Sequence, residues 1–285
     1  MYSCSPKQID KYSMEHKKVN ATASAILARM RDENKAWFTT TQVYEAFPQM
    51  ARSTLRTHLQ LMCEGGLIFR IKKETYWIIP YEMESDTYMP SWHLLAEPLA
   101  GLPYYIGYYS ALQLHGLITQ PSLKEQIVVN RKMSSYATTV KDITFQYIKH
   151  SDEHFYGYKR QWIDDYNRVF VSDLEKTFVD CLFMPHYAGG IIEIAKALYM
   201  SQDKLNYELL LQYIIQMNSK AVVKRLGYLL EIMEIDNPII NQLQAMKSSA
   251  LTPLDTEVPA SGTSTSRWKI IQNVDTQTIK NAIFT

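Results

Sequence analysis

The chain has 285 residues, 46% hydrophobic and 12% aromatic, which gives enough apolar surface for folded cores and favours two domains over one. Its formal net charge of +1 means that any affinity for nucleic acid must come from local patches. Cys4, Cys63 and Cys181 are far apart in the sequence, which argues against a disulfide framework and against a zinc finger. No apolar run is long enough to cross a membrane, and residues 1–18 are unlike a secretory signal, so we expect a cytoplasmic protein.

Residues 1–85 predict a small domain of helices and a β-hairpin. In chain order, the expected elements are a helix over 19–30, a strand at 37–38, a short helix at 42–46, a helix from Ser53 to Cys63, and strands at 67–70 and 75–79. Thr39–Thr41 offers caps for the short helix, and Gly65–Gly66 allows the left-handed turn that closes the longer one. This order is typical of a winged helix-turn-helix, whose third helix enters the major groove of DNA.

The predicted third helix has the charge pattern of a DNA-contacting surface. Between Glu45 and Glu64 the sequence has no acidic residue, and the hairpin adds basic residues that would neutralise phosphates. The expected DNA contacts are Arg52, Ser53, Thr54, Arg56, Thr57 and His58 on the helix, with Arg70, Lys72 and Lys73 on the hairpin. We expect duplex DNA as the partner, with an inverted repeat as the operator. One alternative is open, in which the domain only docks another protein and its arginines are solvated charges.

One winged helix reads one half-site, so a palindromic operator requires two copies of the chain on the DNA. The sequence has no sustained heptads that would indicate a dimer interface. A preformed dimer and two cooperating monomers are both open.

Residues 86–103 contain acids and prolines without a clear period and predict a linker. Residues 104–285 predict a mixed α/β domain, so the fold class is α+β, with a winged helix-turn-helix followed by this second domain. The expected strands are 126–130, 143–148, 155–162 and 169–171, the middle two joined as a hairpin around His150–His154, and the expected helices are 111–114, 190–200, 205–217 and 221–233. Residues 257–266 predict a flexible run, and 268–274 a final strand.

The stretch Val169–Leu182 is central to this second domain. A β-branched and aromatic strand leads into Ser172, and Glu175 follows three residues later, which is the capping box of a helix start. Apolar residues then fall at helical spacing on one side, while Asp173, Lys176 and Asp180 fall elsewhere. We therefore expect a strand that feeds a helix with its charged residues off the apolar face.

Three phrases carry a resemblance to a known family. PYYIGYYSALQLHGL, VFVSDLEKTFVDCLFMPHYAGGIIEIAKAL and VVKRLGYLLEIM, in this order after an N-terminal winged helix, resemble the AbiEi antitoxins, the transcriptional regulators of type IV (abortive infection) toxin–antitoxin systems. The resemblance extends from Val19 to Val274. It implies that the first domain represses the operon's own promoter and that the second counteracts an AbiEii-like nucleotidyltransferase toxin. The helix 52–63 matches no family phrase, so the operator sequence is open.

Basic residues on or beside the strands and first helix of the second domain indicate how a toxin could be opposed. They are Arg131, Lys132, Lys149, Lys159, Arg160 and Lys176. A basic face would compete for a polyanionic RNA substrate, whereas a direct complex with the toxin and a face neutralised by nearby acids are the open alternatives. A competing functional class is a regulator that senses a small molecule in a pocket lined by Tyr104, Tyr105, Tyr108 and Tyr109. Tyrosines packed in a core explain those residues at least as well.

Patterns typical of enzymes fail on their flanks. His150–His154 fits the His-x-x-Glu-His zinc pattern, but strand-like aromatic runs surround it, so we expect a solvated turn. Lys176 lacks the acid that a metal-dependent nuclease needs two residues before it, because that position is Leu174. Gly189–Gly190 precedes a helix without a phosphate-loop lysine. We predict a protein that is not an enzyme and that uses no metal and no cofactor.

Overall fold

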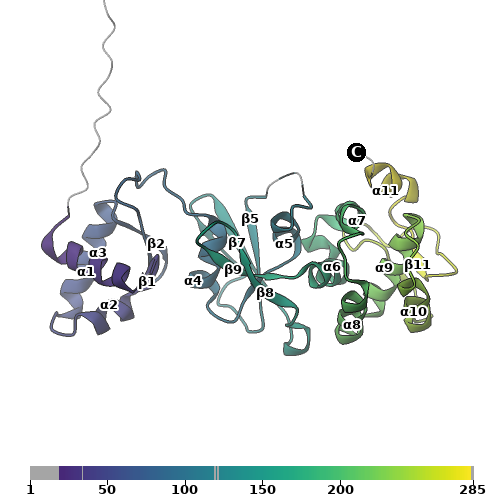
Figure 1. The fold of residues 1–285 in the computed structure, drawn as a ribbon, viewed down its shortest axis with the longest axis horizontal. Helices are drawn as coiled ribbons and strands as arrows, with labels where there is room; N and C mark the ends of the chain where they lie inside the picture. Colours follow the sequence, from purple (N-terminus) through teal and green to yellow (C-terminus); the bar gives the residue numbers. More distant parts are fainter. Residues whose placement is uncertain (1–18, 34, 119, 121, 284–285) are drawn as a thin grey trace, which may run out of the picture. The chain divides into compact units, whose positions relative to one another are not determined.

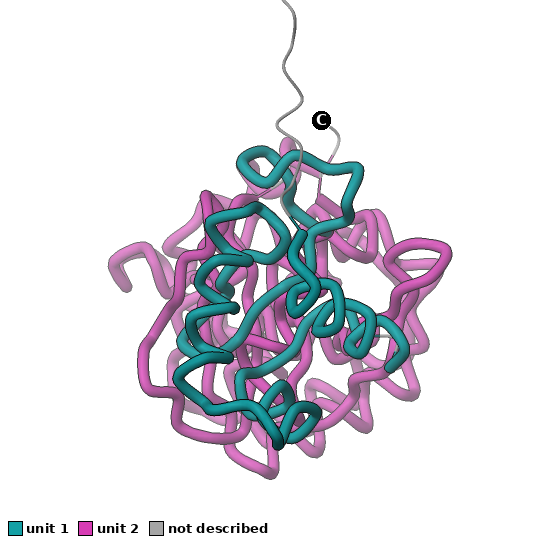
Figure 2. The backbone as a smooth tube through the Cα atoms, turned by 90° about the vertical axis from the view of Figure 1, so that its left-hand side faces the viewer, with its two compact units in different colours: residues 1–90 teal, residues 91–285 magenta. Residues whose placement is uncertain are grey.

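The computed structural model describes residues 19–33, 35–118, 120 and 122–283. The chain divides into two compact units, Met1–Pro90 (unit 1) and Ser91–Thr285 (unit 2), coloured separately in Figure 2. Cys4 and the N-terminal segment compared above with a secretory signal lie outside the described residues. Both units contain helices and strands, which confirms the α+β class.

Unit 1 has the predicted order of helix, strand, two helices and hairpin (Figure 1). Its elements are α1 (Ala21–Asp32), β1 (Trp37–Thr39), α2 (Thr40–Ala46), α3 (Arg52–Glu64), β2 (Ile68–Lys72) and β3 (Thr75–Ile78). Strand β3 lies between β1 and β2 and pairs antiparallel with both. Ile26 of α1 and Leu55 and Leu59 of α3 are buried in one core with Phe38 of β1. The apolar spacing of the sequence therefore accounts for how the helices pack.

Local hydrogen bonds explain where the helices of unit 1 begin. Thr39 and Gln42 form a reciprocal capping box at the start of α2. Helix α3 has no side-chain cap because its N-cap residue is Ala51, so Ser53 lies inside the helix and does not cap it. After α3, Gly66 has a φ of +66°, the left-handed conformation that glycine adopts without strain.

In its described residues, unit 2 contains a six-stranded sheet, with α4 and α5 on opposite sides of it and the later helices gathered beyond α5 (Figure 1). The sheet strands are β4 (Tyr105–Ile106), β5 (Lys124–Val129), β6 (Ala137–Val140), β7 (Ile143–Lys149), β8 (Tyr158–Trp162) and β9 (Arg168–Ser172). The α-helices are α4 (Ala96–Ala100), α5 (Tyr108–Leu114), α6 (Leu174–Phe183), α7 (Gly190–Ser201), α8 (Tyr207–Met217), α9 (Lys220–Ile232), α10 (Ile239–Met246) and α11 (Thr276–Ile283). Short 3-10 helices are η1 (Trp92–Leu95), η2 (Asp152–His154) and η3 (Pro185–Tyr187).

The strand order of the sheet is β6-β7-β5-β4-β9-β8, so β7 and β8 do not pair. Strand β7 pairs with β5 in parallel and with β6 antiparallel, and β8 pairs antiparallel with β9 at the other edge. The predicted hairpin of β7 and β8 is therefore wrong. The sequence analysis missed β6 at residues 137–140, which is too short for a clear alternating pattern, and β6 is the hairpin partner of β7. Residues 150–157 instead carry the chain to the opposite edge strand.

The segment predicted as a linker is partly folded into unit 2. Residues 92–100 form η1 and α4, and Leu95, Ala96 and Leu99 are buried. Prolines and acids obscured this pattern, because Pro98 lies inside the five-residue α4 and the helices are too short for a helical period to show. The prediction of a linker as far as residue 103 is therefore wrong.

The junction of β9 and α6 also differs from its prediction. The N-cap of α6 is Asp173, whose side chain accepts from the Lys176 amide at 2.9 Å. Ser172 is buried in the last strand position and its hydroxyl lies 2.7 Å from that of Thr177. Glu175 does not return to the N-cap, because its Oε1 accepts instead from the Asn206 amide at 2.8 Å. The strand and helix exist as predicted, but the cap is one residue later.

The last part of the chain is held against α9. Strand β11 (Ile270–Ile271) pairs in parallel with β10 (Thr252–Pro253), which shortens the predicted strand at 268–274 to two residues. Trp268 is 1% exposed and its Nε1 donates to Glu231 at 2.7 Å. A Cβ on Gly227 would lie 2.1 Å from the Trp268 ring, so only glycine fits at that helix position. Among the described residues, every helix is too short or too polar to traverse a lipid bilayer.

Candidate nucleic-acid interface

Helix α3 separates an apolar face from a polar one. Leu55, Leu59 and Met62 are buried, as their spacing predicts. The exposed residues of its first two turns are Arg52, Ser53, Thr54, Arg56 and Thr57, and His58 is half-buried. Five of the six predicted helix contacts are thus accessible together.

The turn of the β2–β3 hairpin lies beside this polar face. Arg56 Nη2 is 3.9 Å from Glu74 Oε1, an exposed pair that joins the middle of α3 to the turn. The Glu74 carbonyl accepts from the Thr40 amide at 2.9 Å, which fixes the turn to the start of α2. Lys72 and Lys73 are exposed next to Glu74. The structure therefore brings the predicted helix and hairpin residues onto one surface, together with one acid.

Two arginines of this surface lie over aromatic rings. The Arg52 guanidinium carbon is 5.2 Å from the centre of the Tyr44 ring, and that of Arg70 is 5.7 Å from the centre of the Tyr76 ring. Arg70 Nη2 also donates to the Tyr76 hydroxyl at 3.4 Å. Cation–π contacts at exposed sites restrict a guanidinium without neutralising its charge. Both arginines are held in place as cations.

In unit 2 the six predicted basic residues do not form one face. Arg131, Lys132 and Lys149 line a hollow at the ends of β5 and β7, whereas Lys159 and Arg160 lie on β8 at the far edge of the sheet. Two strands, β4 and β9, separate β5 from β8. Lys176 is fully buried. The prediction of a single basic face is therefore wrong, because neighbours in sequence are placed on separate parts of the sheet.

Arg131 has a structural role that the sequence did not reveal. Its Nη1 donates to the Pro103 carbonyl at 2.9 Å, and its Nη2 donates to the carbonyls of Ala100 and Gly101. These carbonyls end α4 and the segment after it, where a cation is favoured by the helix dipole. Arg131 therefore fastens α4 to the end of β5 and is not a free surface charge.

The charged residues of α6 form a network inside unit 2. Lys176 Nζ lies 2.5 Å from Asp180 Oδ1, and both side chains are fully buried. Lys176 Nζ also donates to the His154 carbonyl at 2.9 Å and lies 4.2 Å from the centre of the Tyr156 ring. Tyr105 donates to Asp180 Oδ2 at 2.9 Å. A buried ion pair of this kind persists only when its remaining donors and acceptors are satisfied, as they are here.

Hydrogen-bond accounting assigns the protonation of His150, which is buried beside this ion pair. The Tyr105 hydroxyl gives its hydrogen to Asp180, so its oxygen accepts from His150 Nδ1 at 3.2 Å. His150 Nε2 is then the acceptor for the Tyr108 hydroxyl at 2.7 Å. Burial lowers the pKa of His150 and raises the pKa values of Tyr105 and Tyr108. All three groups are therefore neutral at physiological pH.

This packing also places the tyrosines that the sensor hypothesis assigned to a ligand pocket. Tyr104, Tyr105 and Tyr108 are buried in the core. Tyr109 is half-exposed, and its hydroxyl donates to the Gln120 carbonyl at 3.0 Å. Their positions are accounted for by packing and by protein hydrogen bonds, without a ligand.

The His150–His154 segment is not the solvated hairpin turn that the sequence predicted. His150 is 3% exposed, and Asp152–His154 form η2. The strand-like flanks indicated a turn, but the chain continues to a different edge of the sheet and packs His150 on the way. Within the described residues, no group of three His, Cys, Asp or Glu side chains is placed to hold a metal ion.

Gly189–Gly190 starts α7 in the left-handed conformation, with φ values of +77° and +83°. The free amide of Ile191 there donates to Asp255 Oδ2 at 2.7 Å. A carboxylate of the chain itself thus occupies the anion-binding position at this helix start.

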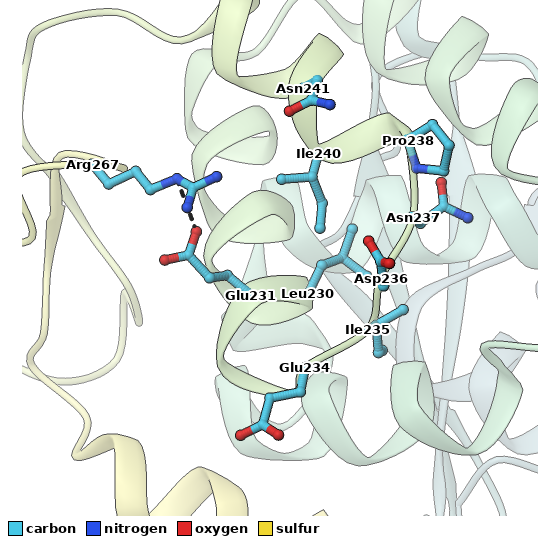
Figure 3. Close-up of a pocket in the computed structure, with 10 residues that line it drawn as sticks. All are labelled: Leu230, Glu231, Glu234, Ile235, Asp236, Asn237, Pro238, Ile240, Asn241 and Arg267. Atoms are coloured by element: carbon cyan, nitrogen blue, oxygen red, sulfur yellow. Dashed lines mark ion pairs between the residues drawn. The ribbon is translucent and has the colours of Figure 1, made fainter.

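An acidic hollow of about 520 Å³ lies between α9 and α10 (Figure 3). Figure 3 shows Glu231 paired with Arg267, whose Nε is 3.1 Å from Glu231 Oε2. Glu234 points away from Glu231 in this view and pairs with Lys280 at 3.0 Å. Most of the acidity of this hollow is therefore neutralised by the chain itself.

Comparisons with known proteins identify a structural neighbour. No protein-family model and no curated protein matches the chain. Among solved structures, the chain is similar to the RV2827C protein of Mycobacterium tuberculosis, with a TM-score of 0.67 over 94% of this chain and 97% of that one, at 12% sequence identity. At this identity the likeness concerns the fold alone, and its coverage includes parts of both units.

Proposed function

We propose that the protein is a DNA-binding transcriptional regulator with a winged helix-turn-helix in unit 1. We further propose that it is the antitoxin and autoregulatory repressor of an AbiE-type operon, acting in the cytoplasm without catalysis. The resemblance of three sequence phrases to the AbiEi family supports the antitoxin role. The joint surface of α3 and the hairpin turn supports DNA binding.

The single observation that carries DNA binding is the contact between Arg56 and Glu74. It places the exposed, acid-free start of α3 beside a turn that carries Lys72 and Lys73. The major groove of B-DNA admits one α-helix, and a basic hairpin beside that helix reaches the flanking phosphates. Ser53, Thr54 and Thr57 add neutral groups that can donate to or accept from base edges.

A mobility-shift titration on the DNA upstream of the protein's own reading frame tests this proposal. Arg56→Ala should weaken operator binding by about 1 to 3 kcal/mol, the value of one bidentate arginine–guanine contact, and relax the preference at one base pair. Arg29→Ala is the matched control, because Arg29 is an equally solvated arginine on α1 that pairs with Glu33 at 3.3 Å. Equal affinity of Arg56→Ala and the unmodified chain would rule out α3 as the groove helix.

Phosphate contacts should behave differently from base contacts. Lys73→Ala should weaken binding to all sequences alike and reduce the slope of log affinity against log salt by about 0.9. Light scattering with and without a full operator should show two copies on the DNA. A single copy on a full operator would contradict the half-site arrangement.

The antitoxin role can be separated from DNA binding in the full-length chain. We expect Arg52→Ala combined with Arg56→Ala to abolish repression, because both cations face solvent on α3, and to leave relief of toxicity intact. The readouts are a promoter fusion and the growth of cells that express the nucleotidyltransferase-like toxin. If the neighbouring reading frame encodes no such enzyme, the antitoxin role is wrong, while DNA binding by unit 1 is unaffected.

A further inference from the structure

The edge of the unit 2 sheet carries an open hollow of about 560 Å³. It is lined by residues of β8, of the start of α6, and of the segment between α7 and α8. The lining residues used below are Lys159, Arg160, Trp162, Glu175, Lys204 and His115. Its volume lies in the range of about 300 to 1,000 Å³ that is typical of small-ligand sites. Its lining is more charged than that of an apolar ligand site.

Cations dominate this hollow. Lys159, Arg160 and Lys204 are exposed, against one lining carboxylate, Glu175. That carboxylate is already engaged, because it accepts from the Asn206 amide at 2.8 Å. In the described part of the chain, neither Lys159 nor Lys204 has an ion pair within 4.0 Å or a side-chain hydrogen bond. These two ammonium groups are therefore available to an anion.

The hollow also has an exposed aromatic side chain. Trp162 is 55% exposed and lies directly opposite Arg168 on β9. The Arg168 guanidinium carbon is 4.2 Å from the centre of the Trp162 ring system, so it covers one face of the indole. The exposed part of the ring then lies on its other face and edge. An indole held in this way can stack with the flat face of an unpaired base.

His115 contributes a hydrogen-bond acceptor to the same lining. Its Nε2 donates to the Ser172 carbonyl at 2.9 Å, which leaves the lone pair of the neutral ring on Nδ1. Burial lowers the pKa of His115, so the ring is neutral at physiological pH. It can accept a hydrogen bond from a sugar hydroxyl or a base amino group.

We propose that this hollow binds an unpaired nucleotide of a single-stranded nucleic acid, with Lys159 and Lys204 on its phosphates and Trp162 stacked on its base. Cationic side chains beside an exposed aromatic ring are the combination by which proteins hold single strands. A duplex buries its base faces and cannot use Trp162. The site belongs to unit 2 alone, so it goes beyond the proposed DNA binding by unit 1 and does not depend on it.

Fluorescence anisotropy with labelled oligouridylate and oligothymidylate tests the site in the full-length chain. Arg52→Ala and Arg56→Ala form the background, so that unit 1 contributes little. Lys159→Ala with Lys204→Ala should flatten the salt dependence by a log–log slope of about 1.4, or 0.7 for each single-strand phosphate. Trp162→Ala should weaken binding roughly five- to hundredfold. The RNA and DNA strands show whether the sugar hydroxyl is read.

Matched controls separate this site from general attraction between a cation and a polyanion. Lys132→Ala with Lys149→Ala removes the same charge from the hollow at β5 and β7, and Tyr166→Ala removes an 88% exposed aromatic side chain from the same β8–β9 hairpin. Both controls should bind as the background does. The proposal is overturned if the two lysine pairs lose affinity equally, if Trp162→Ala binds unchanged while retaining its melting temperature, or if a blunt duplex binds as tightly as the single strands.

Discussion

Helices α3 and α6 both carry charged residues between apolar ones, but they place those charges in opposite environments. On α3 the basic residues face solvent over an apolar core. On α6 both Lys176 and Asp180 are fully buried, since α5, α8 and α9 pack around the helix. The difference shows that a charged residue within an apolar period indicates a surface only when one side of its helix is left uncovered.

The two environments give the same residue types different roles. An exposed pair such as Arg56–Glu74 is screened by water and contributes little to stability, so its arginine can change partners. The Lys176–Asp180 pair is locked by Tyr105 and His150 and specifies how α6 packs on the sheet. Function is therefore expected on α3 and structural specificity on α6.

The largest effect should follow from breaking the buried pair. Asp180→Ala leaves the Lys176 ammonium buried without its carboxylate, and we expect unit 2 to lose about 3 to 5 kcal/mol of unfolding free energy. Glu193→Ala is the matched control, because it breaks an exposed pair with Lys196 on α7 and should cost less than about 1 kcal/mol. Chemical denaturation followed by circular dichroism measures both, and equal losses would contradict a structural network on α6.

A smaller, pH-dependent effect should come from His150. Burial lowers its pKa below the unfolded value of 6.5, so the unfolded chain takes up the proton first. The stability that His150 contributes is complete above pH 6.5 and is lost as the pH falls below it, by up to about 1.4 kcal/mol per pH unit. Denaturation midpoints between pH 7 and pH 5 should fall less steeply in His150→Gln, and an unchanged slope would show that other groups dominate.

The smallest effect should come from Glu74. Glu74→Gln removes the one acid beside Arg56, and unit 1 should change in stability by less than about 1 kcal/mol because the pair is exposed. Operator affinity should rise, since a negative charge next to the phosphates is lost. Reduced operator affinity at unchanged stability would mean that the Arg56–Glu74 pair positions the arginine for its base.

The sequence predicted unit 1 better than unit 2 for a physical reason. In unit 1 the neighbours in sequence are neighbours in space, so the capping box at Thr39 and the apolar spacing of α3 decide the fold locally. In unit 2, β7 is completed by the unpredicted β6, and β8 lies at the other edge of the sheet. Strand order depends on long-range packing, which a single sequence does not display.

The candidate site residues follow the same division. The exposed residues of α3 were predictable because an apolar period assigns their direction. The burial of Lys176 was not, although one signal was present: its partner Asp180 follows four residues later on the same helix face. The hollow at Lys159 depends on Lys204, which is distant in sequence and was not considered a site residue.

The contact of Trp268 with Gly227 fixes where this chain can grow longer. Residues 256–264 are exposed between β10 and β11, and those two strands are held together and against α9. Residues inserted there would enlarge a loop whose ends are already fixed, at a closure cost of about 0.6 kcal/mol per doubling of its length. A single residue inserted in α9 would instead rotate Gly227 by about 100° away from the indole. Changes in chain length are thus tolerated in the loop and not in the helix that faces it.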